Sequence, residues 1–133
     1  MKDSANLRFI PGYEPPSRKT ISSSLIPALY VQKRNECISM VQNEAESVCI
    51  TTDCWTSSLN ESFIAVTAHY ITKYFDSRSI LLECRSFPGN HTSHNLAEEL
   101  RVITKEWNLS NKILFAVSDN ASNICNAIQI ELK

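Results

Sequence analysis

The 133-residue chain is short of several patterns that define whole classes of protein. Its two glycines are too few for tight glycine turns to make most of its connections. Its five cysteines form no Cys-X-X-Cys pair and lie in apolar stretches, which indicates a reducing intracellular compartment. No stretch approaches the roughly 20 apolar residues of a membrane helix, and we expect neither a signal peptide nor a membrane partner.

An excess of positive charge is also missing. Thirteen Lys and Arg residues face fourteen Asp and Glu residues, which gives a formal net charge of −1. Affinity for nucleic acid rests mainly on neutralised phosphates, and here only Arg18-Lys19 and Lys33-Arg34 are adjacent basic pairs. If nucleic acid is the substrate, we expect most of the binding to be done by other parts of the protein.

The hydrophobic content of 43% is sufficient for the core of one domain. Residues 1–20 hold three of the five prolines and few apolar positions, which predicts an extended arm or linker. Residues 21–46 carry apolar side chains at helical spacing after a run of serines, which predicts one long amphipathic helix. We assign residues 47–133 to the folded core.

Three β-branched-rich runs follow the helix, at residues 48–53, 63–72 and 78–87. They are joined by short polar turns, the first containing Asn60 and the second Asp76-Ser77. Such short connections are typical of antiparallel neighbours.

A helix is predicted to begin near residues 93–95, because one stripe of apolar side chains continues from there: Leu96, Leu100, Ile103 and Trp107. We expect Trp107 to lie in the core. The run at residues 113–117 is apolar on both faces, as in a central strand that a crossover helix makes parallel to an earlier one. A last helix follows it. The predicted fold class is therefore α/β, with three antiparallel strands and a fourth strand parallel to the first.

Asp53 and Asp119 are the strongest candidates for chemistry, because each follows an apolar run that reads as a strand. If the fourth strand lies beside the first, both carboxylates lie near the carboxyl ends of adjacent strands, where open α/β sheets place their ligands. Two crowded carboxylates repel unless a cation lies between them, and Mg²⁺ suits such a pair. The alternative is that Asp119 or Asn120 caps the last helix while Asp53 begins a turn.

Other candidate sites are weaker. His91 and His94 are three residues apart, but no acidic or cysteine partner at ligand spacing accompanies them, so we expect no structural zinc. His69, inside the second strand, is expected to be a core or edge residue. No Cys–His pair has the context of a nucleophile.

Several motifs, taken in order, resemble the hAT-superfamily transposases and their domesticated relatives, the zinc-finger BED-domain proteins. They are Thr51-Thr52-Asp53-Cys54-Trp55-Thr56-Ser57, Ala65-Val66-Thr67-Ala68-His69-Tyr70 and Ser118-Asp119-Asn120-Ala121-Ser122-Asn123. Tyr13-Glu14-Pro15-Pro16-Ser17-Arg18 and His91-Thr92 also occupy the family's order, so the similarity covers nearly the whole chain.

The resemblance implies an RNase H-like core that binds Mg²⁺ or Mn²⁺ through two aspartates and a distant glutamate, for DNA strand cleavage and transfer. Asp53 resembles the first catalytic aspartate and Asp119 the second. Trp55 and Asn120 resemble residues that shape the site, and His91 resembles the histidine ahead of the crossover helix. The implied partner is DNA and the implied compartment is the nucleus.

The chain departs from the family pattern in what it omits. The family's glutamate lies beyond a helical insertion, and neither the glutamate nor the insertion is in this sequence. The DNA-binding BED finger and the dimerisation region are missing from it as well. Glu131 does not substitute, because it lies on the helix immediately after Asp119. We therefore expect a partial RNase H-like core, with the third acidic residue absent and no activity alone.

Three interpretations remain open: a piece of a metal-dependent transposase, a non-catalytic interaction or transcription-regulatory module, and a fragment without selected function. A glutamate encoded beyond Lys133 would favour the first. Without a fifth strand, residues 113–117 would be a bare apolar edge, which predicts marginal stability and self-association.

Overall fold

The computed structural model describes residues 13–87, 92–119 and 122–131. The chain divides into two compact units, residues 1–35 and residues 36–133. Within the described ranges no helix is both long enough and apolar enough to span a bilayer.

The first unit is helical. A short helix α1 (Arg18–Thr20) begins at Ser17, whose hydroxyl accepts a hydrogen bond from the Thr20 amide at 3.1 Å. A π-helical turn η1 (Ile21–Leu25) follows, and the Ile26 amide bonds back to the Ile21 carbonyl. This wider turn precedes helix α2 (Ile26–Glu44), whose second residue is Pro27. Because proline donates no amide hydrogen bond, the wider turn admits it without a broken α-helical ladder.

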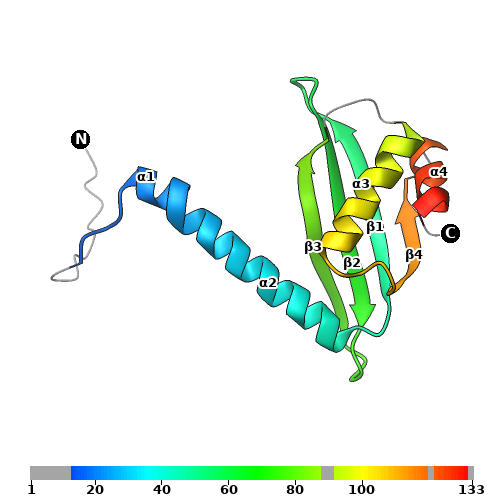
Figure 1. Cartoon of the computed structure of the whole chain (residues 1–133), viewed down its shortest axis with the longest axis horizontal. Helices are drawn as coiled ribbons and strands as arrows, with labels where there is room; N and C mark the ends of the chain where they lie inside the picture. Colours follow the sequence, from blue (N-terminus) through cyan, green and yellow to red (C-terminus); the bar gives the residue numbers. More distant parts are fainter. Residues whose placement is uncertain (1–12, 88–91, 120–121, 132–133) are drawn as a thin grey trace, which may run out of the picture. The chain divides into compact units, whose positions relative to one another are not determined.

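The second unit is built on one mixed four-stranded sheet (Figure 1). Its strands are β1 (Val48–Thr56), β2 (Ser62–Ile71), β3 (Ser77–Ser86) and β4 (Ile113–Ser118), in the spatial order β3-β2-β1-β4. The β1–β2 and β2–β3 pairs are antiparallel, whereas β1 and β4 are parallel. The predicted fold class is confirmed.

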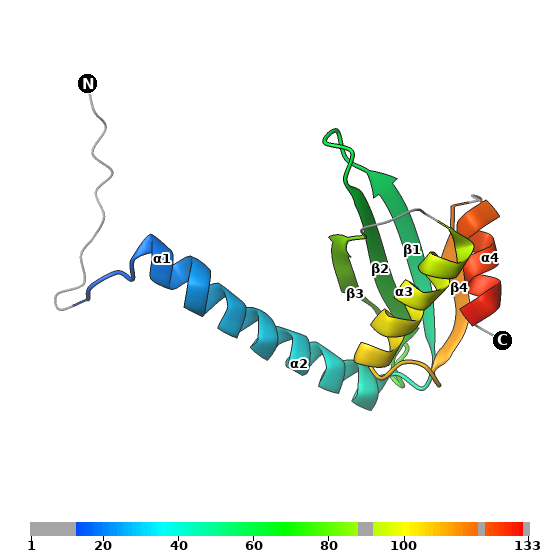
Figure 2. The ribbon, with the colours of Figure 1, turned by 45° about the horizontal axis from the view of Figure 1, so that its top comes forward.

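Helices α3 (Ser93–Glu106) and α4 (Ser122–Glu131) cover the same face of this sheet, as Figures 1 and 2 show. Side chains alternate along the strands, and the set that faces the helices is buried. The predicted stripe on α3 is confirmed, with Trp107 in the core. The buried residues of the sheet and of α3 are Val48, Ile50, Thr52, Ile64, Val66, Ala68, Tyr70, Leu82, Leu96, Ala97, Leu100, Ile103 and Thr104.

The first strand is longer than predicted. We expected it to end at Asp53, but β1 continues to Thr56, because the antiparallel ladder with β2 runs on through Trp55↔Phe63 to Thr56↔Ser62. The parallel ladder with β4 does end near Asp53, at Thr52↔Ser118. The pairing of β1 with β4 therefore ends just before Asp53, whereas its pairing with β2 continues past Asp53.

The position of the fourth strand agrees with the expected bare edge. The run at residues 113–117 is apolar on both faces, as in a central strand, but β4 is an edge strand of the sheet in the part of the chain that the structure describes. Its apolar side chains on the face away from the helices are accordingly open, with Phe115 68% and Val117 55% exposed.

The end of α2 is joined to the start of β4 within residues 36–133. The Lys112 ammonium donates to the carbonyl oxygens of Gln42 at 2.9 Å and Ala45 at 2.7 Å. In the other direction, the Gln42 amide donates to the carbonyl of Asn108 at 3.0 Å. These contacts satisfy carbonyls that the last turn of a helix leaves without partners.

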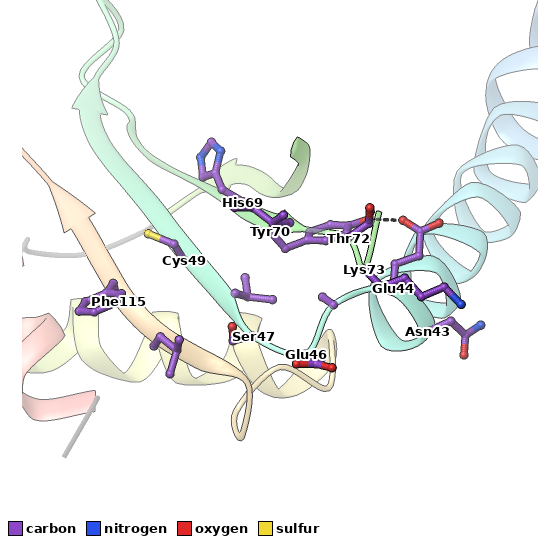
Figure 3. A pocket seen from close by; sticks show the side chains of 14 residues that line it. Asn43, Glu44, Glu46, Ser47, Cys49, His69, Tyr70, Thr72, Lys73 and Phe115 are labelled. Atoms are coloured by element: carbon purple, nitrogen blue, oxygen red, sulfur yellow. Dashed lines mark hydrogen bonds between the residues drawn. The ribbon is translucent and has the colours of Figure 1, made fainter. Parts of the chain in front are cut away.

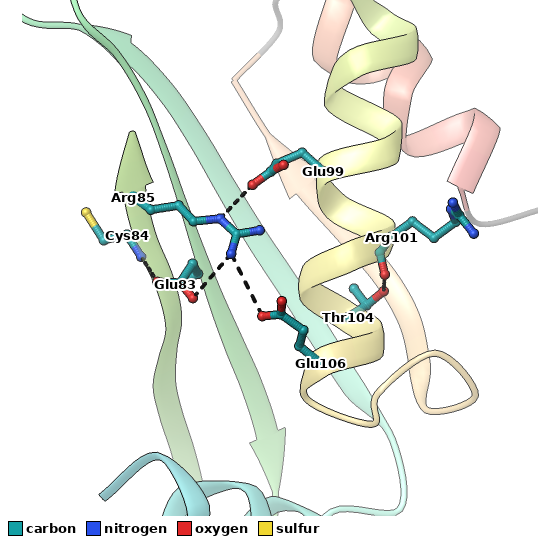
Figure 4. A network of polar contacts seen from close by, with 7 residues as sticks. All are labelled: Glu83, Cys84, Arg85, Glu99, Arg101, Thr104 and Glu106. Atoms are coloured by element: carbon teal, nitrogen blue, oxygen red, sulfur yellow. Dashed lines mark hydrogen bonds and ion pairs between the residues drawn. The ribbon is translucent and has the colours of Figure 1, made fainter. Parts of the chain in front are cut away.

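A charged cluster fixes α3 against the edge of β3 (Figure 4). The Arg85 guanidinium on β3 donates to the Glu99 carboxylate on α3 at 2.6 Å. Glu83 and Glu106 lie 3.9 and 3.8 Å from the same guanidinium. The contacts raise the pKa of Arg85 despite its partial burial, so the guanidinium stays charged among three carboxylates.

Candidate metal-binding site

Asp53 and Asp119 are brought to the same end of two adjacent strands. Thr52 of β1 pairs with Ser118 of β4 in the last rung of the parallel ladder, and each aspartate is the next residue along its strand. Neighbouring strands lie about 4.8 Å apart. Both aspartates are exposed. Asp53 follows buried Thr52, so it points to the sheet face that α3 and α4 leave open.

The Cys54 thiol, which follows Asp53 on β1, registers the negative field of both carboxylates. Cys54 is partly buried, and burial together with Asp53 and Asp119 raises its pKa from 9.0 to about 11. Burial is the largest of these causes, followed by Asp53 and then Asp119. The thiol is consequently protonated at neutral pH, which leaves the two carboxylates as the anionic groups here.

An aromatic pair lies beside Asp53. Trp55 is two residues further along β1, on the same face as Asp53, and its ring stacks on that of Phe63 on β2 with centroids 5.6 Å apart and planes 13° apart. The pair is fixed by the Trp55↔Phe63 rung of the antiparallel ladder. Trp55 is 39% exposed, so part of its indole face is open to a bound molecule.

Small polar side chains lie beneath the aspartates, on the face covered by the helices. The Ser118 hydroxyl donates to the Asp119 carbonyl at 2.9 Å, and the Cys125 thiol of α4 donates to the same carbonyl at 3.8 Å. Thr52 is buried, and its hydroxyl has no hydrogen-bond partner among the described residues. Sequence reasoning missed this layer, although the alternation of a strand predicts it directly behind Asp53.

The remaining candidate residues are placed as follows. His91 and Asn120 lie outside the described residues. His69 lies on β2 opposite Cys49, four rungs of the ladder from Asp53, and its Nε2 atom is 3.0 Å from the Thr51 hydroxyl. Within the described ranges, no group of three or more His, Cys, Asp or Glu side chains is arranged to hold a metal ion. The described site therefore offers two carboxylates.

Comparison with known proteins gives the family. The model of the ZBED1 RNase-like domain matches residues 51–133, which include both aspartates and the last two rungs of the ladder between β1 and β4, Thr51↔Val117 and Thr52↔Ser118. The chain belongs to this family. The predicted resemblance to hAT transposases and zinc-finger BED-domain proteins is thereby confirmed.

Individual relatives agree with the family assignment. A putative transcriptional regulator, tpeD, of Talaromyces stipitatus is 32% identical over 81% of this chain. The putative AC transposase of Zea mays is 28% identical over 81% of the chain, and zinc finger BED domain-containing protein 6 of Mus musculus is 28% identical over 90%. The chain spans only 12 to 14% of the length of these relatives.

The donor chemistry fits a hard divalent cation. Two carboxylates on neighbouring strands supply charged oxygen ligands, as Mg²⁺ and Mn²⁺ prefer. That the two aspartates are metal ligands stays a prediction from the sequence. The geometry described above is compatible with that prediction.

Proposed function

We propose that Asp53 and Asp119 are two of three acidic ligands for Mg²⁺ or Mn²⁺ in a domain derived from a hAT-type DNA transposase. The observation that supports the proposal is the Thr52↔Ser118 rung, because Asp53 and Asp119 are the residues that follow it in the sequence. Such an ion would supply Lewis-acid stabilisation of a phosphate and a nucleophilic water. The two carboxylates would hold the ion.

We further propose DNA as the substrate class and the nucleus as the compartment. The relatives' own descriptions, as a transposase and a transcriptional regulator, support this extension. The stacked pair of Trp55 and Phe63 supports it physically, because nucleobases stack on exposed aromatic faces beside a phosphate-binding site. Since the chain's net charge is −1, most of the affinity for DNA has to come from outside it.

The 133 residues are proposed to be inactive on their own. Two carboxylates can hold one ion weakly, but strand cleavage needs a site that clamps both the attacking and the leaving oxygen. The alternative function is a non-catalytic interaction or regulatory module. It is supported by the description of the fungal relative as a putative transcriptional regulator.

Titration with Mn²⁺ tests the metal site. The wild-type chain should bind one ion weakly, and Asp53→Asn and Asp119→Asn should each weaken binding by about tenfold or more. The matched control is Asp76→Asn, which removes an exposed carboxylate near Arg78 at the other end of the sheet. Equal binding by all four proteins would refute the proposed ligands.

A nicking assay on supercoiled DNA with Mn²⁺ tests the absence of activity. We expect no nicking by the chain alone. Nicking that disappears in both Asp53→Asn and Asp119→Asn would show a complete catalytic site and would reject the regulatory alternative.

Self-association through β4 is the last part of the proposal. Within the described residues nothing pairs with the outer edge of this strand, which combines open backbone groups with exposed Leu114, Phe115 and Val117. Val117→Lys should reduce association at high concentration without loss of folding. Unchanged sedimentation of this variant would remove β4 as the contact.

A further inference from the structure

The hairpin between β2 and β3 ends in an unusual tip. The Thr72 amide donates to the Asp76 carbonyl and the Phe75 amide to the Thr72 carbonyl, both at 2.9 Å. The Thr72 hydroxyl also accepts from the amides of Tyr74 at 3.3 Å and Asp76 at 3.2 Å. These four bonds hold the three residues of the turn, Lys73, Tyr74 and Phe75, in one conformation.

Phe75 occupies a backbone conformation that disfavours it. Its φ of 67° lies in the left-handed region, where glycine or asparagine is the usual residue. Asn60 and Asn108 fill the other positive-φ positions of the described chain. The phenyl ring is 91% exposed and Tyr74 is 74% exposed, so packing within the chain does not compensate the strain. An aromatic side chain held this way is suited to a contact outside the monomer.

A hollow of about 430 Å³ lies beside this tip (Figure 3). Its apolar lining includes Val48, Cys49 and Phe115, from the starts of β1 and β4. Two carboxylates, Glu44 and Glu46, lie on its margin, and Lys73 of the hairpin tip lies on its rim. The Tyr70 hydroxyl donates to Glu44 at 3.1 Å, which fixes one of these carboxylates in place.

We propose that the hollow receives Phe75 of a second copy of this chain. A tip and a hollow at the same end of one sheet allow two copies to exchange them reciprocally about a two-fold axis. The charges are complementary in that arrangement, because Lys73 travels with Phe75 and meets the carboxylate of Glu46 on the other copy. The interface places an aromatic anchor in a hollow with a mixed polar and apolar lining, with a charged pair at its rim.

Nucleic acid fits this surface less well. The tip carries Lys73 and Arg78, but Arg78 lies 4.0 Å from the Asp76 carboxylate, and Glu44 and Glu46 lie beside the hollow. This end of the sheet has no excess of positive charge with which to neutralise phosphates.

Sedimentation velocity over a range of concentrations tests the proposal on the full chain. Wild type should show a concentration-dependent monomer–dimer equilibrium. Phe75→Gly should weaken dimerisation by about tenfold or more while raising Tm, because glycine relieves the left-handed strain. The matched control is Leu59→Ser, which removes a side chain that is 80% exposed at the other hairpin and should leave dimerisation unchanged.

A charge exchange tests which residues meet. Lys73→Glu and Glu46→Lys should each weaken the dimer by about tenfold, and the double variant should recover most of the loss. Failure of the double variant to recover would overturn the facing of these two residues.

Three results would overturn the proposal as a whole. The first is that the wild type stays monomeric up to about 1 mM. The second is that Phe75→Gly leaves the dimer intact while Val117→Lys disrupts it. The third is that the chain binds single-stranded DNA and that Phe75→Gly abolishes this binding. The second would assign association to the β4 edge, and the third would assign the tip to nucleic acid.

Discussion

Replacement of Lys112 by methionine should destabilise the fold more than its partly exposed position suggests. The ammonium donates to the Gln42 carbonyl at 2.9 Å and the Ala45 carbonyl at 2.7 Å, at the end of α2, where the helix dipole favours a positive charge. A hydrogen bond to a charged group contributes about 1.5–3 kcal/mol, and water can replace part of that here because the site is half-open. For the two bonds together we expect a loss of about 2 kcal/mol.

Urea denaturation followed by circular dichroism measures this loss. Methionine keeps most of the aliphatic length of lysine, so the variant isolates the ammonium and its two bonds. Lys105→Met is the matched control, since it removes an exposed ammonium from the last turn of α3. A loss for Lys112→Met no larger than that for Lys105→Met would refute the view that this ammonium joins α2 to β4.

Three further variants and one measurement of cysteine reactivity provide tests of the same structure. Thr52→Val should raise stability by about 1 kcal/mol in urea denaturation, because it removes a buried hydroxyl without a described partner; a loss would mean that the hydroxyl is bonded through water. Alkylation at pH 8 should be slower at Cys54 than at exposed Cys84, because a pKa of about 11 leaves little thiolate at Cys54. Asp53→Asn should speed alkylation of Cys54 by lowering that pKa. Equal rates for Cys54, for Cys84 and for Cys54 in the Asp53→Asn variant would contradict an effect of the Asp53 charge on the thiol. Asp53→Asn should also raise Tm slightly in EDTA and lose the stabilisation that Mn²⁺ gives wild type. Arg85→Met should cost about 1–2 kcal/mol at pH 7 by urea denaturation, because it removes the cation that Glu83, Glu99 and Glu106 share; an unchanged stability would show that these contacts give no net stabilisation.

Much of the fold follows from patterns that are local in the sequence. The period of the apolar side chains separates the strands from α3, and the stripe from Leu96 to Trp107 identifies the buried face of that helix. The preference for right-handed crossovers then favours a fourth strand parallel to the first. In that arrangement Asp53 and Asp119 follow the same end of two adjacent strands.

The features that sequence reasoning missed depend on contacts between distant segments. The length of β1 is decided by its two partners, since the ladder with β2 continues past Asp53 while the ladder with β4 stops. The partners of Lys112 lie about seventy positions earlier, at Gln42 and Ala45. The left-handed Phe75 was missed for another reason: the usual signal for that conformation is glycine or asparagine, and the sequence has neither there.

The two aspartates also explain why the candidate site is costly for the fold that carries it. Neighbouring strands lie about 5 Å apart, and two like charges at that separation in water repel by roughly 1 kcal/mol. Asp53 and Asp119 follow the last rung of the parallel ladder. Burial first, and then the charges of Asp53 and Asp119, raise the pKa of the neighbouring Cys54 thiol. A cation between the carboxylates turns this repulsion into attraction. If Asp53 and Asp119 only capped a helix and began a turn, removal of one carboxylate would lower stability with or without Mn²⁺. If they form a metal site, removal should raise stability without the ion and lower it with the ion, and this reversal of sign is the physical signature that separates the two roles.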